Sequence, residues 1–187
     1  MSANATDALA PLFLTRRLAL RAPTFRDAPR IASLLEDGKV AQTLARVPQP
    51  YTLQDAERFV YWSATEAATG FATFLGLEAR GEGAGLIGLI SLERAENNPD
   101  PVLGYWLGAP YWGRGFMSEA VEAMIAFAKT GLRARRLKSG YFKDNTASAR
   151  IQEKCGFAVV GESRVHALAL GAEVAHIDTA LDLGAAA

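Results

Sequence analysis

The stretch Leu103–Ala120, which reads LGYWLGAPYWGRGFMSEA, decides the fold of this chain. The residues up to Leu107 form a short apolar run that favours a strand. The segment that follows is too rich in glycine and proline to continue a strand. From Met117 to Ala128, apolar side chains recur on one face of an amphipathic helix. The stretch is therefore predicted to be a strand, a glycine-rich turn and the N-terminus of a helix.

The turn has the properties of a site for a phosphate group. Gly113 and Gly115 allow the backbone to approach a ligand closely. The first helical turn leaves N–H groups unpaired, and the helix dipole favours an anion there. Arg114 would add a positive charge. A tight turn that only packs a helix on a sheet has the same pattern. A dinucleotide fingerprint would need glycine at Ser118, and no Walker A sequence occurs.

Outward from this stretch, the pattern predicts one α/β domain at residues 13–187, after a flexible tail at residues 1–12. No change of composition marks a linker, and no internal repeat is visible. Thr52 and Asp55 resemble a capping box at a helix start. Strands are predicted at 14–21, 71–78, 86–92, 102–107, 137–142, 157–167 and 174–183, and helices at 27–35, from 52, from 117 and at 145–154, with turns at 81–85 and 97–101.

Composition narrows the class of protein. The chain has 187 residues with 20 Lys plus Arg and 20 Asp plus Glu, which gives no basic footprint of a nucleic-acid binder. Its one cysteine cannot form an internal disulfide, so we expect a reduced, cytoplasmic setting. Residues 9–14 are followed, not preceded, by Arg16 and Arg17, unlike a signal peptide. The apolar run 85–92 is too short to span a bilayer. No nucleic-acid or membrane partner and no metal site are expected.

Two motifs in order resemble one known family. Pro110–Phe116 (PYWGRGF) and Ser118–Ala120 (SEA) look like the acetyl-CoA motif of GNAT-superfamily N-acetyltransferases of the RimJ/RimL branch. Asp144–Ser148 (DNTAS) and Glu153–Phe157 (EKCGF) look like the second motif of that branch. Residues 15–18 and 50–52 are similar to it as well, so the resemblance covers roughly 15–183. It implies a single-domain α/β fold with a central mixed, mostly antiparallel sheet and helices on both faces.

The resemblance implies acetyl-CoA as the cofactor and assigns residues to it. The strand before the motif would splay from its neighbour and pair with the pantetheine arm, and the loop 113–118 would hold the pyrophosphate. Asn145 would contact the cofactor arm, and Ser148 would be the general acid for the leaving thiolate. The cofactor-binding residues are thus expected to be Tyr105, Trp106, Leu107, Trp112, Gly113, Arg114, Gly115, Phe116, Met117, Ser118, Asn145 and Ser148.

The chain departs from the superfamily pattern at two catalytic positions. Gln152 stands where many members have a tyrosine that acts as the general acid. This leaves Ser148 as the first candidate for the acid and Tyr141 as the second. Val102 stands where an acidic residue often begins the splayed strand, so the general base is unassigned. The candidates for the base are Glu93, Asp100, His166 and His176.

Other conspicuous residues have simpler interpretations. Glu119 is expected to interact favourably with the helix dipole and to cap the helix, rather than to act in catalysis. Cys155 is expected to be a small buried hydrophobe, and Trp112 to pack the loop. The basic residues at 133, 135, 136 and 138 either form a solvated helix end or contact the 3′-phosphate of CoA. Phe59, Tyr61 and Trp62 belong to the core or to the wall of an acceptor cleft.

The predicted function is transfer of an acetyl group from acetyl-CoA to a primary amine, by direct attack in a ternary complex. The acceptor amine is a protein N-terminus, an amino acid or a small molecule. One alternative is a catalytically weak acyl-CoA-binding sensor, and another is a nucleotide-binding module. The sequence leaves the oligomeric state open, a homodimer included.

Overall fold

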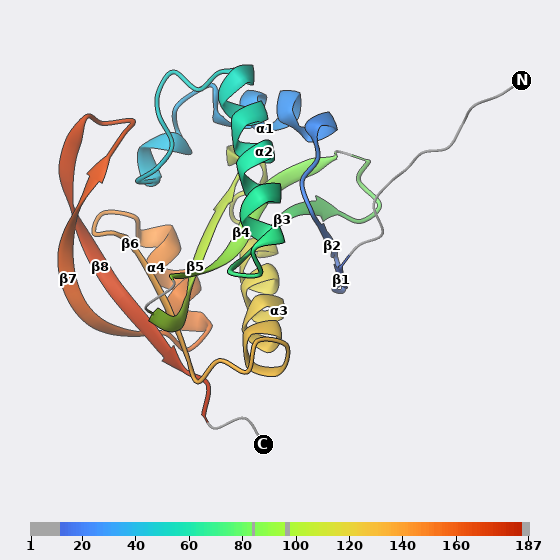
Figure 1. The fold of residues 1–187 in the computed structure, drawn as a ribbon. Helices are drawn as coiled ribbons and strands as arrows, with labels where there is room; N and C mark the ends of the chain where they lie inside the picture. Colours follow the sequence, from blue (N-terminus) through green and yellow to red (C-terminus); the bar gives the residue numbers. More distant parts are fainter. Residues whose placement is uncertain (1–11, 84, 96–97, 185–187) are drawn as a thin grey trace, which may run out of the picture.

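The computed structural model describes residues 12–83, 85–95 and 98–184. In these ranges, eight strands form one mixed sheet in the order β1-β2-β3-β4-β5-β6-β8-β7 (Figure 1). Neighbouring strands are antiparallel except β5 and β6, which are parallel. The strands are β1 (Phe13–Leu14), β2 (Leu18–Arg21), β3 (Ala72–Ala79), β4 (Leu86–Ala95), β5 (Asn98–Leu107), β6 (Arg136–Phe142), β7 (Ala158–Ala167) and β8 (Ala172–Asp182).

Four α-helices accompany the sheet in the described part of the chain. At the start of α2, Thr52 Oγ1 accepts from the Asp55 N–H at 3.2 Å and Asp55 Oδ2 accepts from the Thr52 N–H at 2.9 Å, which confirms the capping box. The helices are α1 (Ala28–Leu35), α2 (Leu53–Ala68), α3 (Phe116–Thr130) and α4 (Thr146–Lys154), with short 3-10 turns η1 (Phe25–Asp27), η2 (Ala41–Thr43) and η3 (Ala109–Tyr111).

The helices cover both faces of the sheet, as predicted. Phe74 of β3 packs edge-on against Trp62 of α2, with ring centroids 4.9 Å apart. Phe13 pairs across the sheet with Leu20, and Leu20 with Leu77, so these three side chains share the face opposite to Phe74. Phe13 contacts Phe127 of α3 at 5.1 Å. Helices α1 and α2 therefore lie on one face, and α3 lies on the other.

Two predicted strands differ from the observed ones. The single strand predicted at 14–21 is wrong, because a turn at 15–17 divides it into β1 and β2. The turn forms because Thr15 Oγ1 accepts from the Leu18 N–H at 2.9 Å, while Glu119 of α3 accepts from the Arg17 N–H at 2.7 Å. Strand β5 begins at Asn98 rather than at Val102, since the hairpin with β4 already pairs Ala95 with Asn98. The predicted tail lies outside the described residues, apart from Leu12.

Candidate active site

Strands β5 and β6 part shortly after they meet. They are in register at the pair Val102 and Lys138, and the Ser139 hydroxyl donates to the Leu103 carbonyl at 2.9 Å. Beyond this point β5 continues to pair with β4, and β6 with β8. A slot of about 530 Å³ opens between the separating strands. The predicted splay is therefore present in the fold.

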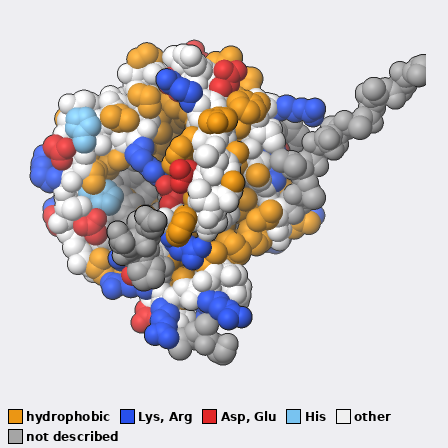
Figure 2. All heavy atoms as spheres, in the orientation of Figure 1, with side chains coloured by type: hydrophobic (Ala, Val, Ile, Leu, Met, Phe, Trp, Pro, Cys, Tyr) orange, Lys and Arg blue, Asp and Glu red, His pale blue; other side chains and the backbone are white. Residues whose placement is uncertain are grey.

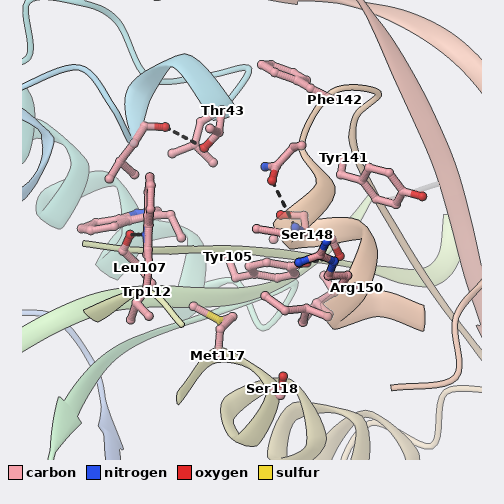
Figure 3. Close-up of a pocket in the computed structure, with 18 of the residues that line it drawn as sticks. Thr43, Tyr105, Leu107, Trp112, Met117, Ser118, Tyr141, Phe142, Ser148 and Arg150 are labelled. Carbon is pink, nitrogen blue, oxygen red and sulfur yellow. Dashed lines mark hydrogen bonds between the residues drawn. The ribbon is translucent and has the colours of Figure 1, made fainter. Parts of the chain in front are cut away.

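The slot brings most of the predicted residues together. In Figure 3, Thr43 and Phe142 border it opposite Met117 and Ser118, while Tyr105 and Ser148 reach it from β5 and α4. Arg114 and the candidate bases Glu93, Asp100 and His166 do not line it. The predicted residues that line the slot are Tyr105, Trp106, Leu107, Trp112, Gly113, Gly115, Phe116, Met117, Ser118, Tyr141, Asn145 and Ser148.

The glycine-rich turn has the backbone geometry that the sequence predicts. Gly113 has φ +73° and Gly115 has φ +76°, which side chains with a Cβ rarely adopt. A Cβ added at Gly113 would meet no heavy atom within 4 Å, so the space beside this backbone is open. Gly115 is the N-cap of α3, and the residues of the first turn of this helix, whose N–H groups have no partner within the helix, line the slot. The Trp112 indole donates to the Leu107 carbonyl at 2.6 Å and holds the turn on β5.

Arg17 was missed by sequence reasoning and lies beside this turn. Its guanidinium donates to the Arg114 carbonyl at 2.8 Å and lies 4.9 Å from the centre of the Phe116 ring. Glu119 holds it, with Arg17 Nε 2.7 Å from Glu119 Oε2. The Arg114 side chain instead forms an ion pair with Glu82. The resemblance of residues 15–18 to the family was the available signal. It could not predict the contact between Arg17 and Arg114, because the two residues are far apart in the sequence.

Glu119 is a structural anchor. Burial opposes its ionisation, but hydrogen bonds from Thr15 and Arg17 outweigh burial and lower the pKa of the carboxyl. The Thr15 hydroxyl donates to it at 2.6 Å. This carboxylate joins the first turn of α3 to the turn between β1 and β2, in addition to its favourable place in the helix dipole.

A buried amide organises the α4 side of the slot. Gln152 is 1% exposed. Its Nε2 donates to the Ser139 hydroxyl at 3.0 Å and to the Tyr105 hydroxyl at 3.2 Å, and its Oε1 accepts from the Thr179 hydroxyl at 2.6 Å. Burial raises the pKa of Tyr105. Gln152 therefore ties β5, β6 and β8 to α4 at the point where the sheet opens, a role that sequence reasoning did not assign.

The two predicted residues on α4 lie at its first turn. Asn145 is the N-cap, and its Oδ1 accepts from the Ser148 N–H at 3.1 Å. This bond fixes the backbone from which the Ser148 hydroxyl projects at the slot. Tyr141 shares a face of β6 with Ser139, and so with α4, because side chains alternate along a strand.

His176 reaches the slot from the opposite face of the sheet. It pairs with Phe142 on β6, which belongs to the alternate set of side chains. Its Nδ1 lies 2.9 Å from Asp178 Oδ1, so Nδ1 carries the hydrogen and Nε2 is left as an acceptor. The ring covers Gly140, where an added Cβ would lie 2.2 Å from His176 Cε1. A side chain at position 140 would displace the imidazole.

His176 has a carboxylate, a hydroxyl and apolar groups around it, and Arg150 of α4 lines the same slot. Asp178 on its own strand is its carboxylate partner, and Ser163 on β7 donates to the same Asp178 oxygen at 3.0 Å. Strand β6 presents Gly140 and Phe142, and the segment after η2 presents the uncharged Leu44 and Ala45 to the same slot.

The other three candidate bases are engaged elsewhere. Glu93 receives two hydrogen bonds from Arg46, at 2.9 and 2.6 Å. Asp100 pairs with Lys138 at 3.3 Å. His166 lies 3.5 Å from Glu173 near the end of the β7–β8 hairpin and is not among the slot residues. Figure 2 shows the histidine side chains on the hairpin side of the molecule.

Cys155 is half-buried, and burial raises the pKa of its thiol, which agrees with a small hydrophobe rather than a nucleophile. No group of three or more His, Cys, Asp or Glu side chains that could hold a metal ion occurs in the described ranges. No helix among the described residues is long and apolar enough to cross a membrane.

The slot fits coenzyme A by its chemistry. One end has a helix N-terminus with open space over Gly113, which suits a pyrophosphate. The middle is an extended channel between two strand backbones, lined by Tyr105, Trp106 and Met117, which suits an amide-containing arm. The fold and this slot define an acyltransferase that uses a coenzyme A thioester.

The comparisons with known proteins agree. The chain belongs to the family of the acetyltransferase (GNAT) domain, which it matches over residues 17–158. It is an acyl-CoA-dependent acetyltransferase, and acetyl-CoA is its cofactor. The curated Bacillus subtilis (strain 168) protein YoaA, an uncharacterised N-acetyltransferase, is 29% identical over 165 residues, which are 82% of this chain and 86% of YoaA.

Solved structures of the predicted branch share the fold. RimL, a ribosomal-protein alpha-N-acetyltransferase in complex with coenzyme A, has a TM-score of 0.79 at 24% identity, over 92% of this chain and 97% of RimL. RimJ of Mycobacterium smegmatis, in complex with a CoA disulfide, has a TM-score of 0.77 at 16% identity, over 88% of this chain and 81% of RimJ. The prediction of a GNAT fold similar to RimJ and RimL is confirmed.

Proposed function

We propose that this protein transfers the acetyl group of acetyl-CoA to a primary amine by direct attack within a ternary complex. The observation that carries the proposal is the slot between β5 and β6. One end meets the N-terminus of α3, and the middle is bordered by Ser148 on one face of the sheet and His176 on the other. Both reactants can therefore meet without a covalent acyl-enzyme.

Acetyl-CoA supplies an activated acetyl thioester when it is bound. The amine that attacks it must lose a proton, and His176 Nε2, with Nδ1 held by Asp178, is the group placed to accept it. The leaving thiolate must gain a proton, and the Ser148 hydroxyl is the group placed to donate it. Glu93 is a weaker base, because its carboxylate is paired twice with Arg46. Tyr141 is the second candidate for the acid.

The first experiment measures thermal unfolding of the protein with acetyl-CoA, CoA, NAD and ATP. A ligand that binds only the folded state stabilises it, by about 2.7 kcal/mol at a hundredfold excess over its dissociation constant. We expect acetyl-CoA and CoA to raise the melting temperature, and NAD and ATP not to do so. A rise with NAD or ATP alone would contradict the assignment of the slot.

A substitution in the turn tests the same assignment. Gly115→Glu adds a side chain at φ +76° and a negative charge where the phosphates are expected. A Cβ at Gly115 would also lie 3.3 Å from Arg17 Nη2. The variant should fold and should lose the shift with CoA. Normal CoA binding by a folded Gly115→Glu would mean that the pyrophosphate lies elsewhere.

A further inference from the structure

A second cavity lies on the α1–α2 face of the sheet. It has a volume of about 330 Å³, and its walls come from α1, α2, the segment 44–51 and strands β3 to β5. It shares Leu44, Ala45, Gly104, Tyr105 and Trp106 with the coenzyme A slot. A group in this cavity therefore lies next to the middle of the slot, where the thioester is expected, and not at its phosphate end.

Gly104 leaves the passage between the two cavities open. It lines both of them, and a Cβ added there would lie 3.0 Å from Ser91 Oγ. Any side chain at this position would project from β5 into the space between the cavities. Glycine thus leaves room for an acceptor to extend from the second cavity to the slot.

The second cavity is walled by aromatic rings. Phe59 and Trp62 of α2 both pack on Phe74 of β3, with centroids 6.0 and 4.9 Å apart. Tyr51 closes the end near the start of α2, and burial raises its pKa to about 12. Figure 2 shows hydrophobic side chains gathered around α2 on this side of the molecule. Such walls favour an apolar group over a hydrated one.

Among the described residues that line this cavity, the charged side chain is a cation, Arg46. Arg46 lies at its rim with 69% of its side chain exposed, 5.9 Å from the centre of the Trp62 ring. Its guanidinium is paired with Glu93, whose Oε1 also accepts from Ser91 Oγ at 3.0 Å. A second ammonium group deep in the cavity would lose its hydration among aromatic rings without an unpaired carboxylate to replace it.

We propose that the acceptor is a primary amine that carries an aromatic or similarly bulky apolar group within a few bonds of its nitrogen. The apolar group occupies the cavity between Phe59, Trp62 and Phe74, and the amine reaches the slot across Gly104. This inference rests on the proposed function and specifies its substrate. The chemistry fits a free arylalkylamine or a peptide that begins with an aromatic residue.

The transfer balances without a further reactant. The amine nitrogen forms a bond to the acetyl carbonyl carbon, and the bond from that carbon to sulfur breaks. One amine proton goes to the base on the protein, and the thiolate takes one proton to leave as free CoA. The products are an N-acetylated amine and a thiol, and the thiol can be measured directly.

The test compares acceptors by release of CoA thiol at saturating acetyl-CoA. The free amines are 2-phenylethylamine, tyramine, ethanolamine and spermidine, and the peptides are two tetrapeptides that begin with phenylalanine or serine. We expect the aromatic acceptors to exceed the others by about tenfold or more in kcat/KM, since the ring is removed from water only for them. The two aromatic arms distinguish a free amine from a peptide N-terminus.

Two neighbouring residues on α2 provide a matched pair of variants. Trp62→Ala removes one wall of the cavity and should raise KM for the best aromatic acceptor about tenfold, with KM for acetyl-CoA unchanged. Tyr61→Ala removes a side chain that is 68% exposed and is not among the cavity residues, and it should change neither value. Gly104→Val should keep CoA binding and lose turnover.

The outcomes separate this inference from the proposed function. Equal or better turnover of spermidine, ethanolamine or the serine peptide would overturn the aromatic acceptor while acetyl transfer stood. Failure of every aromatic acceptor in a protein that binds acetyl-CoA would overturn it as well. Loss of acetyl-CoA binding itself would instead overturn the proposed function. If Trp62→Ala and Tyr61→Ala behaved alike, the cavity would not be the acceptor site.

Discussion

The two faces of the sheet differ sharply at the slot. On the α4 face, Tyr105 and Gln152 belong to one buried hydrogen-bond network, and Ser148 stands at its edge. On the α1–α2 face, an apolar cavity adjoins the slot, and His176, paired with Asp178, lines the slot. One face is fixed by hydrogen bonds and the other leaves space. We therefore propose that the leaving thiolate is protonated from the α4 face and that the amine arrives from the α1–α2 face.

The difference between the two faces arises from the alternation of side chains along two strands. On β5, Tyr105 turns to α4, while Gly104 belongs to the set that shares the face of Phe74. On β6, Ser139 contacts Gln152, while Gly140 lies under His176. The α1–α2 face thus receives both glycines, which leave space there, and the α4 face receives both polar side chains, which hydrogen-bond to Gln152.

The largest expected effect comes from His176, which lies on β8 and lines the slot. His176→Gln should lower kcat/KM by about a hundredfold, as expected for loss of a general base. His166→Gln is the matched control, because His166 also pairs with a carboxylate but lies away from the slot. Steady-state kinetics at one pH measure both variants. Similar kinetics for the two variants would leave the acceptor face without a base.

The next effect concerns the rigidity of the α4 face. Gln152→Leu leaves the buried Thr179 hydroxyl without its acceptor and the Ser139 hydroxyl without one donor, and it should lower the free energy of unfolding by about 2 kcal/mol. Glu153→Gln, at the exposed neighbour on the same helix, should leave it unchanged. Urea denaturation measures the difference. An unaltered midpoint for Gln152→Leu would mean that packing, not the network, holds this face.

Ser148→Ala should lower kcat by about tenfold or more, since a donor to the leaving thiolate is lost, while KM for acetyl-CoA stays constant. The cap of α4 survives, because Asn145 accepts from the backbone N–H of residue 148. Thr146→Ala, on the same helical turn, is the control. A kcat equal to that of the unmodified protein would transfer the acid role to Tyr141, and Tyr141→Phe would then show the loss.

The smallest effect is a pH dependence on the α3 side. The pKa of Glu119 is lowered in the folded state, so its stabilising contribution is present above the unfolded pKa and is lost as pH falls through the folded pKa. Glu119→Gln should therefore be less stable than the unmodified protein at pH 7, and the gap should narrow at acidic pH. Chemical denaturation at several pH values tests this. A constant gap would assign the loss to packing instead of charge.

Most of the fold could be predicted, and the reason is local. The glycines at 113 and 115, the cap at Thr52 and the helical period after Met117 are each determined by neighbours in the chain. The division of the first strand escaped prediction because the contact that bends it comes from Glu119, about a hundred residues away. The sequence could name His176 as a candidate base but could not rank it among the four. Its ability to act as a base depends on contacts with Asp178 and Gly140 and on its position in the slot.

The sequence by itself determined a strand, a glycine-rich turn and a helix, together with the motifs that mark the family, because these features depend on residues close in the chain. The tertiary structure alone decided which side chains face the slot from which side. It placed Arg17 at the turn, buried Gln152 under β5 and opened an aromatic cavity across Gly104. The physical reason is that strand pairing and helix packing bring together segments that are far apart in the sequence, and local sequence patterns do not predict such contacts.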